Sequence, residues 1–273
     1  MLQEQKDYWI DDYGLVWDQY DEAFTEPVPV HALGTLIHTI EAYMAAAEAT
    51  TEPEWLDRAE KMTAFAYKVA SKNNWRIPEY YDEEWQPSLE AGKLCNDGRR
   101  YHEGYVTGHS MQLARFALQV RAGLRSTGWA VPDYLMELGT ELFERARVDG
   151  WRRTDGAPGF STAVNDQGDP VPGEDEHQQW VVCEGVCATV AVRRAMLDDG
   201  HRIDEVEHFE HCYRSFVDYI HDYLIAQPGR WIRRLGPHNE SVQPAKSSRW
   251  DVYHAIQAML AIRVPLWPPT APA

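Results

Sequence analysis

The chain has 273 residues, 44% of them hydrophobic, and its formal net charge at pH 7 is −17. This length and apolar content allow one large domain with a sizeable core, while the longest apolar runs fall short of the roughly 20 residues that span a bilayer. Nucleic acid and anionic membranes repel so acidic a surface, so neither is expected as a partner.

Helical periodicity dominates the chain. A short helix is expected within 2–20 and a regular one over 32–50, where Leu33, Leu36 and Ile40 recur on one face. The limits of the later helices are set by prolines near their predicted starts and by a glycine or proline after their predicted ends. These later helices are expected over 54–72, 108–124, 133–148, 180–197, 203–225 and 250–263.

The connections between these helices alternate in length. Short turns join antiparallel helix hairpins, and long loops in a compact domain are usually functional. The pattern predicts an all-α toroid of helix hairpins, a single domain over 1–273, with a cleft at the end where the long loops gather. The short turns are 50–53, 126–132 and 198–202, and the long loops are 73–107, 149–179 and 227–249.

The four cysteines, Cys95, Cys183, Cys187 and Cys212, show no paired framework, which favours a reducing cytoplasm. Cys183 and Cys187 lie one helical turn apart, as metal ligands can, but no further pair completes a zinc site. Two small residues on a buried helix face are the better interpretation. Glycine-rich phosphate loops are absent as well. We therefore predict neither a metal site nor a cofactor.

Three histidines, His38, His109 and His254, each lie near the start of a predicted helix. Histidine suits proton transfer, because its ordinary pKa of about 6.5 keeps both protonation states accessible near neutrality. A single histidine is usually structural, whereas three at helix starts suggest a site where helix ends converge on a polar substrate. Other histidines, such as His31 and His201, are expected to be structural or solvated.

Several segments resemble motifs of the N-acylglucosamine 2-epimerase superfamily. Residues 108–115, Gly-His-Ser-Met-Gln-Leu-Ala-Arg, are similar to its Gly-His-x-x-Glu-Trp-Ala/Ser-Arg motif. The Ala-Arg ending resembles the aldose–ketose isomerases that act on mannose or sulfoquinovose. Residues 38–42 are similar to its Met-His-x-x-Glu-Ala motif. Further similar segments are Asn74-Trp75, Pro78 to Asp82, Trp85, Trp180 with Glu184, and Lys246 to His254.

The resemblance implies an (α/α)6 barrel of about twelve helices. At the usual hairpin length, this chain holds about seven or eight helices. We therefore expect an incomplete barrel that lacks its first hairpins and forms an open arc. Such an arc would expose apolar helix faces, so homo-oligomers are expected.

The resemblance also implies an activity, the interconversion of an aldose and a ketose of the mannose–fructose type, or 2-epimerisation, through a cis-enediol. It implies that His109 and His254 form the acid–base pair acting on a monosaccharide. The residues expected to bind this substrate are His38, Gln112, Trp180, Glu184, Arg99 and Asp251.

One position departs from the family pattern. Gln112 stands where the motif has a glutamate, three residues after His109 and on the same helix face. A glutamine forms hydrogen bonds but carries no charge. We therefore expect weak catalysis and a gain of activity in Gln112→Glu.

Two other functions remain open at this point. An (α/α)6-barrel glycoside hydrolase would need two opposed carboxylates in the cleft, for which Glu79, Asp82 and Glu184 are candidates. A non-catalytic sugar-binding remnant of the family would fit the missing hairpins and Gln112.

Overall fold

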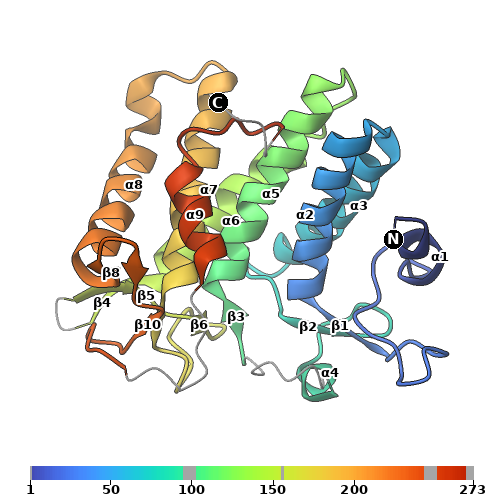
Figure 1. The fold of residues 1–273 in the computed structure, drawn as a ribbon, viewed down its shortest axis with the longest axis horizontal. Helices are drawn as coiled ribbons and strands as arrows, with labels where there is room; N and C mark the ends of the chain where they lie inside the picture. Colours follow the sequence, from blue (N-terminus) through green and yellow to red (C-terminus); the bar gives the residue numbers. More distant parts are fainter. Residues whose placement is uncertain (1, 95–102, 155–156, 243–250, 269–273) are drawn as a thin grey trace.

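Antiparallel helix hairpins make up most of the fold (Figure 1). The computed structural model describes residues 2–94, 103–154, 157–242 and 251–268. Each short turn predicted from the sequence joins one hairpin, as expected. The hairpins are α2 (Leu33–Thr50) with α3 (Pro53–Ala70), α5 (Thr107–Ser126) with α6 (Tyr134–Gly150), and α7 (Gln179–Asp198) with α8 (Glu207–Tyr219).

Helices α3 and α6 lie behind α2 and α5, and α8 lies at one edge of the molecule (Figure 1). Helix α2 contacts α5, α5 contacts α7, and α7 contacts the last helix, α9 (Val252–Leu260). Helix α5 also packs against α3 and α6, so it is buried along nearly its whole length. This central position explains why a segment with polar residues such as Gln112, Arg115 and Gln119 is nevertheless buried.

Short two-stranded antiparallel ladders tie the long loops together at one end of the helices. Three of their strands, β1, β3 and β7, run directly into α2, α5 and α7, so the ladders fix where these helices begin. In the described part of the chain every ladder has only two strands, which confirms the all-α class. The pairs are β1 (Val30–Ala32) with β2 (Tyr80–Asp82), β3 (Tyr105–Val106) with β6 (Ala163–Val164), β4 (Trp151–Thr154) with β5 (Ala157–Phe160), β7 (His177–Gln178) with β10 (Arg234–Leu235), and β8 (Ile225–Gln227) with β9 (Arg230–Trp231).

The structure corrects several predicted helix bounds. Within 2–20, only α1 (Leu2–Tyr8) is helical, because the Asp11 carboxylate accepts hydrogen bonds from the backbone of Tyr13 and Leu15 and bends the chain. The segment 203–225 divides into a 3-10 turn (Ile203–Val206), α8 and a π turn (Ile220–Leu224). The loop after β2 contains a helix that was not predicted, α4 (Leu89–Leu94).

The two cysteines of α7 lie on a buried face of that helix, as the sequence suggested. Cys183 and Cys187 are buried free thiols, and burial raises the pKa of Cys187 to about 12. Both therefore pack as small apolar residues. Across the helices that the structure describes, none combines the length and apolar character that a bilayer crossing requires.

Candidate functional site

The site lies where the strand-to-helix junctions meet the last helix. Gly108 at the start of α5 packs against the indole of Trp180 at the start of α7, and a Cβ at position 108 would overlap that ring. Only glycine therefore allows the two helix starts to approach this closely. The Gly-His step noted in the sequence thus places His109 beside Trp180, with ring centroids 5.3 Å apart.

His109 is held by Glu79, the residue directly before β2. Its Nδ1 atom lies 2.7 Å from Oε2 of Glu79, a buried carboxylate. The other oxygen of Glu79 accepts a hydrogen bond from the backbone N–H of Val106, at 3.1 Å. One carboxylate therefore binds both the residue before α5 and the imidazole in its first turn.

His254 is held within its own helix. Asp251 caps α9, accepting from the backbone N–H of His254, and its carboxylate lies 2.8 Å from Nδ1 of the same residue. Burial acts to raise the pKa of Asp251, but the hydrogen bonds from His254 outweigh it and lower that pKa. The imidazole contacts Trp180 at a centroid distance of 5.7 Å. Both histidines therefore contact one indole.

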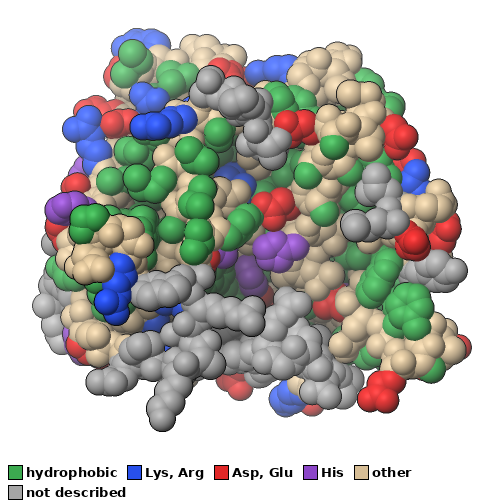
Figure 2. Space-filling view, in the orientation of Figure 1, with side chains coloured by type: hydrophobic (Ala, Val, Ile, Leu, Met, Phe, Trp, Pro, Cys, Tyr) green, Lys and Arg blue, Asp and Glu red, His purple; other side chains and the backbone are tan. Residues whose placement is uncertain are grey.

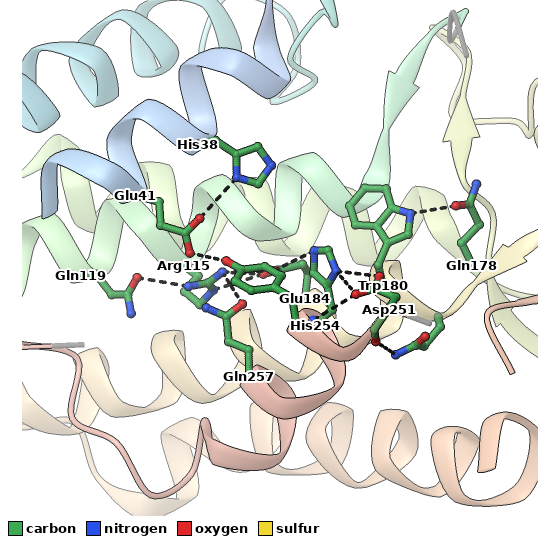
Figure 3. Close-up of polar contacts among 12 residues, drawn as sticks. His38, Glu41, Arg115, Gln119, Gln178, Trp180, Glu184, Asp251, His254 and Gln257 are labelled. Carbon is green, nitrogen blue, oxygen red and sulfur yellow. Dashed lines mark hydrogen bonds and ion pairs between the residues drawn. The ribbon is translucent and has the colours of Figure 1, made fainter. Parts of the chain in front are cut away.

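A buried ion pair lies beneath His254. Arg115 of α5 donates from Nε and Nη2 to both oxygens of Glu184 of α7, at 3.0–3.1 Å. Although burial disfavours the guanidinium cation, the Glu184 carboxylate raises the pKa of Arg115. Oε1 of Glu184 also lies 3.8 Å from Nε2 of His254. Gln119 and Gln257 accept further hydrogen bonds from Arg115, which links α5, α7 and α9 (Figure 3).

His38 lies at the exposed edge of this group. Its Nδ1 atom is 3.3 Å from the carboxylate of Glu41, which also accepts a hydrogen bond from the hydroxyl of Tyr253. Burial acts to raise the pKa of Glu41, but these two hydrogen bonds outweigh it, so the pKa is lowered. The Tyr253 bond joins α2 to α9 across the site. On the molecular face in Figure 2, histidine and acidic side chains meet near the middle.

A pocket of about 160 Å³ adjoins these residues between α2, α5, α7 and α9. Glu41, Arg115, Gln119 and Gln257 supply its polar wall, and the remaining lining is largely apolar. In the described part of the chain, no group of three His, Cys, Asp or Glu side chains is arranged to hold a metal ion.

The structure brings together most of the residues expected to form the site. His109 and His254 each contact Trp180. Glu184 and Asp251 adjoin His254, and His38 is linked to this group through Glu41 and Tyr253. Gln112 is buried, and its Nε2 atom has no hydrogen-bond partner among the described residues. Arg99 lies outside the described residues.

Sequence reasoning missed four residues that form these contacts. Glu79 was considered only as a carboxylate for hydrolysis, and Glu41, Arg115 and Tyr253 were not assigned to the site. All four lie inside segments that resemble the family, so their motif positions were the available signal. The partners of Glu79 and Tyr253 are 30 and 212 residues away, and no local pattern reports such pairs.

Comparisons with known proteins agree with this architecture. The family model for N-acylglucosamine 2-epimerase (GlcNAc 2-epimerase) matches residues 2–258. A D-mannose isomerase of Pseudomonas cannabina pv. alisalensis is 30% identical over 272 residues, covering 98% of this chain and 63% of the relative. The chain therefore spans somewhat less than two thirds of that relative's length.

Solved structures show the same fold. A crystal structure of D-mannose isomerase superposes with a TM-score of 0.79 at 22% identity, covering 96% of this chain and 63% of that one. Cellobiose 2-epimerase from Spirochaeta thermophila DSM 6192 superposes with a TM-score of 0.72 at 16% identity, covering 96% and 62%. At these identities the likeness concerns the arrangement of helices.

Proposed function

The chain belongs to the N-acylglucosamine 2-epimerase family, and from this premise we propose that it is a sugar isomerase that interconverts an aldose and a ketose of the mannose–fructose type. The proposed substrate is a monosaccharide, and the proposed acid–base pair is His109 and His254. The mannose type is supported by the D-mannose isomerases among its relatives.

One observation carries the proposal: two imidazoles contact the same indole, and each has its Nδ1 atom on a carboxylate. A carboxylate accepts hydrogen bonds, so Nδ1 carries the proton and Nε2 carries the lone pair in each neutral ring. Such a pair supplies both a base and an acid near neutral pH. The Trp180 ring offers a flat apolar surface for the carbon side of a sugar.

The proposed reaction moves a proton between neighbouring carbons. One neutral imidazole removes the proton from C2 of the open-chain aldose while the partner imidazolium protonates the carbonyl oxygen on C1, giving a cis-enediol. The first ring then delivers its proton to C1 as the second takes the proton from O2. The ketose forms, and both histidines regain their initial protonation states. Because the imidazoles supply both acid and base, the scheme requires no metal ion.

The contacts favour this reaction over glycoside hydrolysis. Glu184 is in a buried ion pair with Arg115, and Glu79 binds His109 and Val106. Asp82 accepts hydrogen bonds from the backbone of its own turn. Each candidate carboxylate thus has a positioning contact, whereas hydrolysis requires an opposed acid and base or nucleophile. The free thiols of α7 fit the reducing cytoplasm that we propose as its location.

The test is incubation of the purified chain with D-mannose in D2O, with products followed by NMR. We expect D-fructose, with deuterium at C1 to the extent that the proton held by the first ring exchanges with solvent before it is delivered. His109→Gln and His254→Gln are expected to lower kcat by about 10²–10⁴-fold, while His201→Gln, on an exposed side chain, leaves it unchanged. Undiminished turnover in both site variants would refute the mechanism. D-Glucose as the product would indicate 2-epimerisation, and sugar binding without turnover would indicate a remnant.

A further inference from the structure

We propose that Glu79 is the positioning residue that sets the tautomer of His109, holding the imidazole with a carboxylate from the loop before α5. The inference rests on the proposed function for its kinetic consequence. Its structural consequence, the location of one proton on His109, can be measured whether or not the chain turns over a sugar.

Glu79 is fixed at three atoms. Its backbone carbonyl accepts from the N–H of Leu33 at 2.8 Å, at the start of α2. Its two carboxylate oxygens bind the N–H of Val106 and Nδ1 of His109, at the start of α5. The residue is 5% exposed, so water competes little for these contacts. Glu79 thus joins the starts of the helices that carry His38 and His109.

The hydrogen bond from the backbone of Val106 determines which atom of residue 79 faces the imidazole of His109. The N–H of Val106 is a donor, so it requires an oxygen at the Oε1 position. The second oxygen then faces Nδ1 of His109, where only a proton on Nδ1 completes a hydrogen bond. The neutral ring is thereby held with its lone pair on Nε2, and the carboxylate stabilises the imidazolium formed when Nε2 takes a proton.

Gln112 does not have the chemistry to replace this contact. It lies one turn after His109, is 1% exposed, and its Nε2 atom is without a partner in the described part of the chain. An amide can position a neighbouring group but cannot offer a negative charge to an imidazolium. Among the described contacts, the carboxylate at Nδ1 of His109 is that of Glu79, from the loop before α5.

Glu79→Gln gives a sharp test because Val106 dictates how the new amide must lie. With its oxygen on the N–H of Val106, the amide nitrogen faces His109 and donates, so Nδ1 becomes an acceptor and the proton moves to Nε2. We expect the histidine ¹⁵N–¹H correlation spectrum to report this switch for His109, assigned by comparison with His109→Gln. Glu84→Gln, an exposed carboxylate of the same loop, is the matched control and should leave the spectrum unchanged.

Turnover provides the second measurement. Glu79→Gln is expected to lower kcat for the mannose–fructose reaction by about 10²–10⁴-fold, because the base then has the wrong tautomer. KM is expected to stay within about twofold, because Glu79 acts through His109. Thermal unfolding of each variant checks that the fold is kept, and Glu79→Ala, which offers no donor, should lose activity without fixing the Nε2–H tautomer.

The outcomes separate this inference from the proposed function. A His109 ring that keeps its proton on Nδ1 in Glu79→Gln would overturn the inference whatever the activity. A tautomer switch in a chain without turnover would support the role of Glu79 while the proposed reaction fails. A tenfold gain in Gln112→Glu, with Glu79→Gln fully active, would place the carboxylate role at position 112 and overturn the inference.

Discussion

At the scale of single residues, the ion pair between Arg115 and Glu184 places two charges in the protein interior. Both side chains are nearly inaccessible, and each oxygen of Glu184 accepts from the guanidinium. Removing one partner of such a pair leaves a buried charge without compensation. The pair therefore makes the packing of α5 against α7 sensitive to either residue.

We expect Glu184→Ala to lower the free energy of unfolding by about 3–5 kcal/mol, the usual cost of an uncompensated buried charge. Urea denaturation followed by circular dichroism measures it. The matched control is Arg125→Ala, which breaks a solvent-exposed pair with Asp199 and should cost at most about 1 kcal/mol. Equal losses in the two variants would contradict this account of the Arg115–Glu184 pair.

Two buried histidines outside the site lead to a pH prediction. His31 is stacked between Trp17 and Trp85, and burial lowers its pKa. His177 packs against Gly159, and burial lowers its pKa as well. A depressed pKa means that the folded state binds fewer protons than the unfolded state. Their contribution to stability is therefore present above the unfolded pKa of about 6.5 and is lost as the pH falls.

We expect the free energy of unfolding to decrease between about pH 7 and pH 5, by about 1.4 kcal/mol for each unit by which a histidine pKa is depressed. Urea titrations at a series of pH values measure this slope. His177→Gln should be less stable at pH 7 but show a flatter slope, whereas His201→Gln, on an exposed histidine, should keep the original slope. An unchanged slope in His177→Gln would exclude that residue as a cause.

At the scale of helices, the contact between the starts of α5 and α7 depends on the absence of a side chain at Gly108. The six-membered ring of Trp180 occupies the space that a Cβ would need. This contact also places His109 beside the indole. Separation of the two helix starts should therefore affect both stability and the site.

Gly108→Ala is expected to cost about 1–3 kcal/mol of stability, typical of overpacking in a tight interior. It should also lower turnover, because His109 and Trp180 are displaced from each other. The double variant Gly108→Ala with Trp180→Leu removes the obstructing ring, and should recover stability but not turnover. Recovery of neither in the double variant would show that crowding against Trp180 is not the cause.

At the scale of the whole molecule, the outer face of α9 is apolar and open to solvent. Val252, Ile256, Met259 and Leu260 are each at least 43% exposed and lie at helical spacing. Hydrophobic side chains gather over this helix in Figure 2. Contiguous apolar surface of this kind commonly marks an interaction site, which agrees with the homo-oligomer expected from the sequence.

We therefore predict that the chain self-associates through α9. Light scattering coupled to size exclusion should give a mass above 31.4 kDa that rises with concentration. The double variant Ile256→Glu with Met259→Lys should return the mass to that of the monomer. Ile203→Glu, an exposed apolar residue outside α9, should not. A wild-type chain that is monomeric at all concentrations would disprove the prediction.

The sequence alone determined the hairpins and the principal histidines, because both are local properties. Apolar residues at helical spacing predicted α2 and α5–α7 within a few residues, and Pro53 and Pro132 indicated where hairpins turn. The Gly-His step at Gly108 and the cap at Asp251 are likewise local. Bounds were wrong where side chains bend the backbone, as Asp11 does after α1.

Only the tertiary structure decided which residues complete the site. Periodicity states which face of a helix is buried but not which neighbour it meets, so the partners of His109 and Glu41 could not be derived from it. Glu79 reaches His109 because β2 pairs with β1 and the Glu79 carbonyl binds the start of α2. Tyr253 reaches Glu41 because α9 packs on α7 beside α2. These contacts join segments far apart in the chain, and their geometry follows from packing the whole set of helices at once.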